Sequence, residues 1–348
     1  MEKNKSLIFS FFFLLAISLY SQTNIDGKVY DQLTKLPLEG VSIYYDGTTF
    51  GTITDEKGFF SLEIKNNLES PLVVSYLGYE TRVYEKSKLD LHLEIGLVEK
   101  STSLDEIFLT NDDWSRNKKL NIFKREFLGN TVSSLDCKII NEKDIRIVYN
   151  KNDDALYAFC NTPIIIENKY LGYELIYNLV EFEVKFKTSL NGFRQTERVF
   201  YSGTSNFKEL NKKLKKKYIK KRKAIYNGSV LHFMRCLAGK QLSENNFQVF
   251  IKDSSGKSKL YFQTSPEKVF YIKEIKGKGT QVNILEKEPV TIRFNGLSQS
   301  SIMINDDEKV FYIDDYGIYS PIDKLYFGGD FGFNRISTML PSNYGIEN

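Results

Sequence analysis

The chain has few of the residues on which metal and nucleophile chemistry depends. Its 348 residues include two histidines, three cysteines and one tryptophan. A zinc peptidase needs a His-x-x-Glu pair and a distant third ligand. His92 is followed three residues later by Ile95, and His232 by Arg235, so neither histidine supplies that pair. The sequence therefore predicts no metal site, no bound cofactor and no zinc-dependent catalysis.

Motifs for nucleophilic catalysis are missing as well. No Gly-x-Ser-x-Gly elbow occurs. Cys236 lies four residues after His232, which places both on one helix face and favours packing over attack. We therefore assign His232 and Arg235 to a polar seam between structural units. The three cysteines, Cys137, Cys160 and Cys236, are predicted to be small buried residues, with one disulfide in an oxidising compartment as the alternative.

The chain also has few long hydrophobic runs and little excess of either charge. Lys and Arg number 48 against 44 Asp and Glu, a net charge of +4, which indicates no nucleic-acid partner. The one long apolar run, residues 7–19, follows Lys3 and Lys5 and is shorter than the roughly 20 residues of a membrane-spanning helix. We predict that residues 1–21 are a signal peptide cleaved after Ser21, with an uncleaved anchor as the alternative. Export would place the protein in the periplasm or at the outer-membrane periphery of a Gram-negative bacterium.

Residues 22–98 consist of short alternating or β-branched segments separated by turns rich in glycine and aspartate. Seven such segments predict an antiparallel β-sandwich. Gly58 is expected to adopt a positive φ in its turn. Asp55 is expected to accept backbone N–H groups there, and a calcium site at Asp46, Asp55 and Glu56 is the alternative.

The spacing of these turn residues carries a family resemblance. The motifs are Gly27-x-Val29, Pro37-Leu38-x-Gly40-Val41, Gly51-Thr52-x-Thr54-Asp55-x-x-Gly58-x-Phe60 and Val74-Ser75-Tyr76-x-Gly78-Tyr79. The region resembles the carboxypeptidase-regulatory-like family. That resemblance implies a transthyretin-like sandwich in a Bacteroidota envelope protein, where the domain often precedes TonB-dependent receptor barrels. It brings no peptidase activity, because the chain lacks the zinc motif.

The rest of the chain is predicted to be a larger, β-rich α+β domain. Residues 99–113 form a connector with a short strand, and residues 114–348 form the domain, so the fold class is mainly β with helical insertions. In the long alternating stretch 173–187, Ile176, Val180 and Phe182 are expected to share one strand face. Two motifs, Phe127-Leu128-Gly129-x-Thr131 and Tyr226-x-Gly228-Ser229-x-x-His232, resemble the C-terminal region of the same Bacteroidota proteins, to which the resemblance assigns no activity.

A basic segment within the predicted helical insert 207–239 is the most distinctive feature of this domain. Residues 208–223 contain nine lysines and one arginine against Glu209 alone. We predict that they form a helix, anchored by a stripe of Leu210, Leu214 and Tyr218, whose cationic face contacts an anionic envelope surface or an acidic protein. The candidate contact residues are Lys212, Lys213, Lys216, Lys217, Lys220 and Arg222. A solvated helix face is the alternative.

These observations favour a non-catalytic exported envelope protein with a binding or scaffold role. The alternative is a hydrolase that acts on envelope glycans through a carboxylate pair. The adjacent pairs are Asp112/Asp113, Asp153/Asp154, Asp306/Asp307 and Asp314/Asp315. An integral outer-membrane barrel is not expected, because the strands are irregular and a basic helical segment interrupts them.

Overall fold

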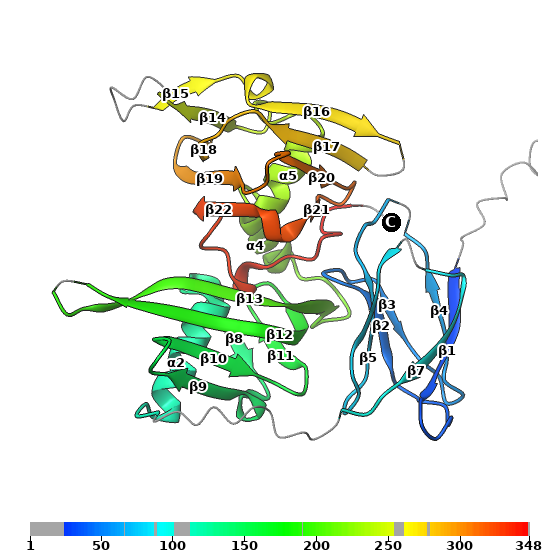
Figure 1. The fold of residues 1–348 in the computed structure, drawn as a ribbon. Helices are drawn as coiled ribbons and strands as arrows, with labels where there is room; N and C mark the ends of the chain where they lie inside the picture. The colour runs from blue at the N-terminus through cyan, green and yellow to red at the C-terminus, as the bar shows by residue number, and fades with distance from the viewer. Residues whose placement is uncertain are drawn as a thin grey trace, which may run out of the picture.

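Three hydrophobic cores organise the chain. The computed structural model describes residues 24–346 apart from 66, 87–88, 101–111, 190, 254–260 and 277–278. The cores define a sandwich (residues 24–100), a middle unit (112–227) and a distal unit (228–330), and a C-terminal tail (331–346) connects them (Figure 1). The mainly β fold with helical insertions is confirmed. The predicted signal peptide and the short strand predicted within the 99–113 connector, at residues 107–110, lie outside the described residues.

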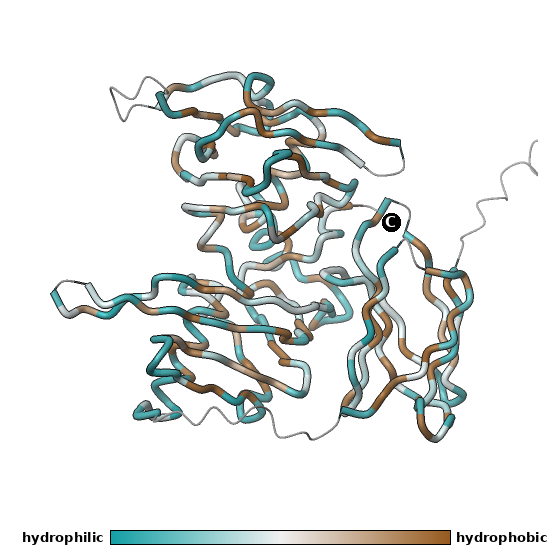
Figure 2. Tube along the Cα trace, viewed as in Figure 1, coloured by the Kyte–Doolittle hydropathy of each residue, from teal (hydrophilic) through white to brown (hydrophobic). Residues whose placement is uncertain are grey.

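The sandwich contains two sheets with seven strands among its described residues. One sheet has the order β4-β1-β7 and the other β3-β2-β5-β6. Hydrophobic and hydrophilic residues alternate along its strands (Figure 2), and the inward positions, such as Val29, Ile43 and Ile95, are buried. The strands are β1 (Asn24–Asp31), β2 (Ser42–Tyr45), β3 (Gly51–Ile53), β4 (Phe59–Glu63), β5 (Leu72–Ser75), β6 (Arg82–Tyr84) and β7 (His92–Leu97).

One strand pair differs from the antiparallel prediction. β1 and β7 run parallel, with Val29 opposite Ile95. Parallel neighbours need a long connection, and the five strands between β1 and β7 supply it. Turn signals in the sequence report local hairpins, so they carry no information on this non-local pair.

The middle unit is a sheet with one helix packed on its core. β12 is central: it pairs with β13 along its whole length and with β11 and β10 on its other edge. Phe123 and Phe127 of α2 are buried against Phe182 of β12. Its elements are α2 (Arg116–Leu128), α3 (Val132–Leu135), β8 (Cys137–Ile139), η2 (Glu142–Asp144), β9 (Arg146–Asn150), β10 (Ala155–Phe159), β11 (Ile164–Asn168), β12 (Tyr173–Thr188), β13 (Arg194–Glu209) and α4 (Lys216–Tyr226).

A β-bulge divides β12 into two halves with different inward faces. The register with β13 shifts between Leu179 and Glu181. Before the shift Tyr177 is buried, and after it Phe182 is buried, while Val180 is 75% exposed. The extra residue moves the inward set from odd to even positions. The predicted single face through Ile176, Val180 and Phe182 is therefore wrong.

The distal unit has two sheets with the orders β15-β14-β18-β19-β22 and β16-β17-β20-β21. Helix α5 packs against β17 and β20, with Phe233 buried in the common core. The elements are α5 (Val230–Ala238), β14 (Phe247–Lys252), β15 (Tyr261–Thr264), η3 (Pro266–Lys268), β16 (Phe270–Ile275), β17 (Gly279–Ile284), β18 (Val290–Phe294), β19 (Ser298–Ile304), β20 (Val310–Ile313), β21 (Tyr319–Ser320), η4 (Ile322–Lys324) and β22 (Leu325–Gly329).

The tail returns across the other units. In η5 (Ile336–Thr338), the Ser337 carbonyl accepts hydrogen bonds from Ser133 and from Asn168 of the middle unit. Further on, the Ser342 amide donates to the carbonyl of Gly47 in the sandwich. Figure 1 shows the C-terminus beside the sandwich. The tail therefore ties the three units together.

Candidate functional site

Helix α4 presents a cationic face to solvent. Lys216, Lys220 and Lys223 follow one another at helical spacing, and all three are exposed. Lys212 and Lys213, in the turn before the helix, are exposed too. Within the described part of the chain, none of these five lysines makes an ion pair within 4.0 Å. The face therefore carries several uncompensated charges.

The opposite side of α4 is anchored by a buried arginine. The Arg222 side chain is 3% exposed and forms a two-pronged ion pair with Glu209, at 2.7 Å for each nitrogen. It also donates to the Leu171 carbonyl at 2.8 Å and lies 3.6 Å from the centre of the Tyr173 ring. Such a planar fork suits a site where several acceptors converge. Arg222 therefore holds α4 on the end of the β12–β13 pair.

Tyr218 completes this anchor by close packing. It is buried, one helical turn before Arg222. A Cβ added at Gly172 would lie 2.5 Å from the Tyr218 ring, so only glycine permits this approach. Gly172 also has a φ of +78°. The helix thus sits directly on the turn that begins β12.

The basic segment differs from the prediction in three ways. Helix α4 begins at Lys216, because residues up to Glu209 extend β13 by pairing with the start of β12. In the predicted stripe Tyr218 is buried, but Leu214 is 43% exposed because it precedes the helix. Arg222 is an internal anchor and not a surface contact. Lys212, Lys213, Lys216, Lys217 and Lys220 are all exposed, as an anion-binding face requires.

His232 and Arg235 lie where α5 meets the rest of the molecule. His232 is buried among Tyr226, Phe247 and Phe294, and its Nδ1 accepts from the Gly228 amide at 3.1 Å. Burial lowers the pKa of this imidazole below 6.5, which favours the neutral form. Its surroundings are those of a packed aromatic cluster.

Arg235 joins the distal unit to the tail. Its guanidinium donates to the carbonyls of Tyr316, Ser342 and Tyr344 at 3.1, 2.6 and 2.7 Å. These acceptors come from the β20–β21 turn and from the tail. The polar seam expected at this residue is thus a contact between segments far apart in the sequence.

In each adjacent carboxylate pair, at least one member has a structural partner. Asp112 forms an ion pair with Lys119 and accepts from the Trp114 amide. Asp154 contacts Arg194 and Tyr149, and Asp306 pairs with Lys324. Asp314 accepts three backbone N–H groups, from Glu69, Tyr316 and Ile318. One carboxylate of each pair therefore has a structural role.

The seam between the sandwich and the other units is a feature that sequence reasoning missed. Asp46, in a sandwich turn, accepts from the Ser205 amide of β13 at 2.6 Å. Tyr316 of the distal unit is 9% exposed and belongs to the sandwich core. Burial raises the pKa of both the Asp46 and Asp314 carboxyls to about 6. Two seam carboxylates therefore resist ionisation.

The turn at Asp55 behaves as predicted. One carboxylate oxygen accepts from the amides of Lys57 and Phe59 at 2.9 and 2.8 Å. Asp46 belongs instead to the seam with β13. Among the described residues, no group of three or more His, Cys, Asp or Glu side chains is placed to hold a metal ion.

The fold and the comparisons classify the N-terminal unit. It is a two-sheet β-sandwich whose glycine turns and core alternation match the predicted pattern. Residues 25–109 match the CarboxypepD_reg-like domain family. The N-terminal unit of this chain is therefore a carboxypeptidase-regulatory-like domain, a non-catalytic β-sandwich. No curated protein matches the chain.

Among the described residues, no helix is both long and apolar enough to cross a bilayer.

Proposed function

We propose that this chain is an exported, non-catalytic protein of the Gram-negative cell envelope that uses the α4 face to contact an anionic envelope surface. The observation that carries the proposal is the set of exposed lysines on and before α4, which have no ion-pair partner in the described structure. The regulatory-like sandwich supports a binding role, because the family's fold is non-catalytic. The sandwich packs on the middle unit, and this contact would hold the α4 face in a fixed position.

The lysines of α4 reduce the stability of the helix, which supports a functional reason for their presence. Lys216 and Lys217 lie in the first turn, where the helix dipole disfavours positive charge by a few tenths of a kcal/mol each. The N-cap residue, Lys215, makes no side-chain capping bond, and the first turn has no acidic residue. Like charges at i,i+4, such as Lys216 and Lys220, add similar costs. A helix designed for stability alone would not combine these features.

The test is co-sedimentation of the purified mature chain with vesicles. One set contains phosphatidylglycerol in phosphatidylcholine, and the other contains phosphatidylcholine alone. We expect salt-sensitive binding to the anionic vesicles only, because each lysine near such a surface contributes about 1 kcal/mol within a Debye length. A Lys212/Lys213/Lys216/Lys220→Gln variant should lose at least about tenfold in partitioning, a change of about 1.4 kcal/mol.

The control separates local charge from net charge. A Lys57/Lys143/Lys273/Lys287→Gln variant removes the same number of charges from exposed sites elsewhere. It should bind anionic vesicles nearly as well as the wild type. Equal loss in both variants, or no binding by the wild type, would support the solvated-face interpretation instead.

A further inference from the structure

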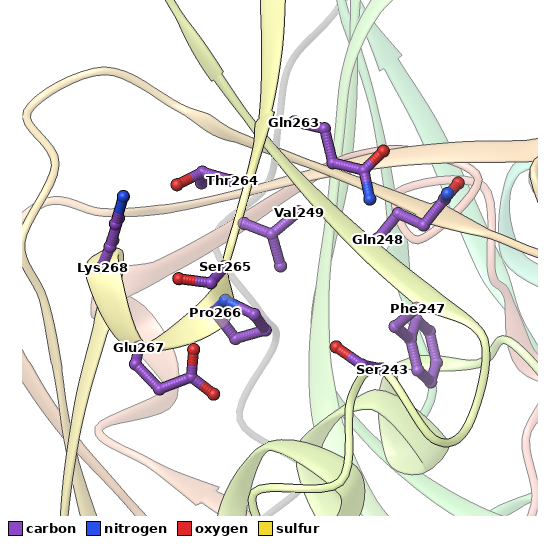
Figure 3. A pocket seen from close by; sticks show the side chains of 10 residues that line it. All are labelled: Ser243, Phe247, Gln248, Val249, Gln263, Thr264, Ser265, Pro266, Glu267 and Lys268. Atoms are coloured by element: carbon purple, nitrogen blue, oxygen red, sulfur yellow. The ribbon is translucent and has the colours of Figure 1, made fainter.

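A polar groove crosses one end of the distal unit. It lies between the start of β14, the end of β15, the loop after α5 and η3 (Figure 3). Its main part has a volume of about 550 Å³, and an adjoining hollow of about 260 Å³ shares Ser243, Pro266 and Glu267 with it. Pockets for small ligands commonly measure about 300–1,000 Å³. The combined space therefore suits a ligand of several rings.

The groove contains side chains whose hydrogen-bonding groups are free. Ser243, Gln248, Gln263 and Glu267 line it, and none of their side chains makes a hydrogen bond or ion pair in the described part of the chain. Each carboxamide offers two donors and two acceptor positions, and the serine hydroxyl offers both functions. The site can therefore donate and accept at several points at once.

The strand register brings the two carboxamides to one side of the groove. Gln263 of β15 pairs with Phe250 of β14, two residues beyond Gln248. Gln248 and Gln263 are thus diagonal neighbours on one sheet face, a geometry with separations of about 7–8 Å. In Figure 3 both carboxamides lie at the same end of the groove. A ligand there would meet them in succession.

Apolar surface accompanies these polar groups. Pro266, which is partly exposed, lines both the main part and the adjoining hollow. Tyr271 of β16 lines the adjoining hollow and is 57% exposed. A tyrosine ring is flat and apolar, with a polar hydroxyl at its tip. It can stack on a ligand ring whose face is apolar and whose edge carries polar groups.

We propose that this groove binds a short, neutral oligosaccharide. Sugar hydroxyls both donate and accept, so they can pair with the carboxamide and hydroxyl groups that line the groove, and a pyranose face can stack on Tyr271. Lys240, Lys268 and Glu267 leave one net positive charge, which salt screens.

The experiment is isothermal titration calorimetry of the full mature chain with cellotetraose, maltotetraose, xylotetraose and chitotetraose. We expect saturable binding of at least one. A Gln248→Ala/Gln263→Ala variant should weaken that binding at least tenfold, and Tyr271→Ala should weaken it severalfold. Gln195→Ala, at an exposed glutamine on β13, is the control and should leave the affinity unchanged.

Two results would overturn the proposal. One is the absence of heat for all four sugars with folded wild-type protein. The other is equal affinity of the wild type and the groove variants, which would place any sugar site elsewhere. Because α4 is not part of the groove, these outcomes are independent of the vesicle experiment.

Discussion

Gly58 shows how one residue determines the geometry of a sandwich turn. Its φ is +77°, and a Cβ there would lie 2.4 Å from the backbone oxygen of Val29. Gly40 has a similar φ of +76°, but a Cβ at Gly40 would meet nothing within 4 Å. The two glycines therefore separate the cost of backbone conformation from the cost of a steric clash.

We predict that Gly58→Ala destabilises the protein markedly more than Gly40→Ala. The positive φ alone costs about 1–2 kcal/mol for an L-residue, and both variants pay it. In Gly58→Ala the clash with a backbone atom should raise the loss to about 3 kcal/mol or more. The midpoints of urea unfolding measure both losses. Equal midpoints would show that the Gly58 turn can shift to make room.

Arg222 is the residue on which the position of α4 depends. We predict that Arg222→Met lowers the free energy of unfolding by about 3 kcal/mol, because Glu209 and the Leu171 carbonyl lose their partner. Arg222→Lys should recover only part of that loss, since one ammonium cannot reproduce the fork. Lys220→Met, on the exposed side of the same helix, should change stability by less than about 0.5 kcal/mol. Chemical denaturation of the three variants tests this order.

Some residue roles can be predicted from local sequence and others cannot. Asp55 was predictable because the groups that donate to its carboxylate are amides of its own turn, two and four residues away. Arg222 was not, because it stands in a run of lysines and its partner Leu171 lies 51 residues away. Local spacing gives no sign of that contact.

At the scale of elements, the sequence predicts the presence of strands and helices more accurately than the residues at which they begin and end. The stretch 173–187 was correctly expected to be a long strand, and the structure has β12 at Tyr173–Thr188. The bulge near Leu179 could not be predicted, since it arises from pairing with β13. In the basic segment, charge favoured an early helix start, but strand pairing extends β13 to Glu209. Non-local pairing decided both cases.

The exposure of the lysines was predicted better than the anchor that holds their helix. The lysines expected at the surface are exposed, because no nearby acid in the sequence could pair with them. The buried anchor on the opposite side depends on the turn at Gly172, which sequence spacing does not reveal. The free groups of the distal groove were equally hidden, since they come from separate segments.

At the scale of the whole molecule, the sandwich is not an appendage. Tyr316 from the distal unit packs in the sandwich core. The Phe50 ring meets the Tyr316 ring edge-on, with the two ring centroids 6.3 Å apart. The Thr49 amide donates to Asn343 of the tail. The sequence suggested a sandwich joined by a connector, because contacts across about 300 residues leave no local pattern. Motion of the sandwich would therefore require breaking a packed interface.

The interface between the sandwich and the other units also makes the free energy of unfolding depend on pH. The Asp46 and Asp314 carboxyls have a pKa of about 6 in the folded protein because burial disfavours their charge, against an ordinary 3.8. Glu69 adds like-charge repulsion at Asp314. Between pH 3.8 and about 6, the folded state thus keeps protons on these two carboxyls that the unfolded state has released. This contribution to stability is complete below about pH 3.8 and is lost as the pH rises through about 6.

We predict that Asp46→Asn flattens this dependence and stabilises the protein above pH 7. Asparagine keeps an oxygen to accept from the Ser205 amide, but it carries no charge to desolvate. The gain at pH 7.5 should be about 1–2 kcal/mol, less than the full shift implies because the site retains some solvent screening. Thermal unfolding at pH 5 and pH 7.5 measures it, and Asp314 should preserve part of the wild-type slope. Asp26→Asn, at an exposed position on β1, serves as the control. If Asp46→Asn and Asp26→Asn show the same slope as the wild type, ionisation of Asp46 does not weaken the seam.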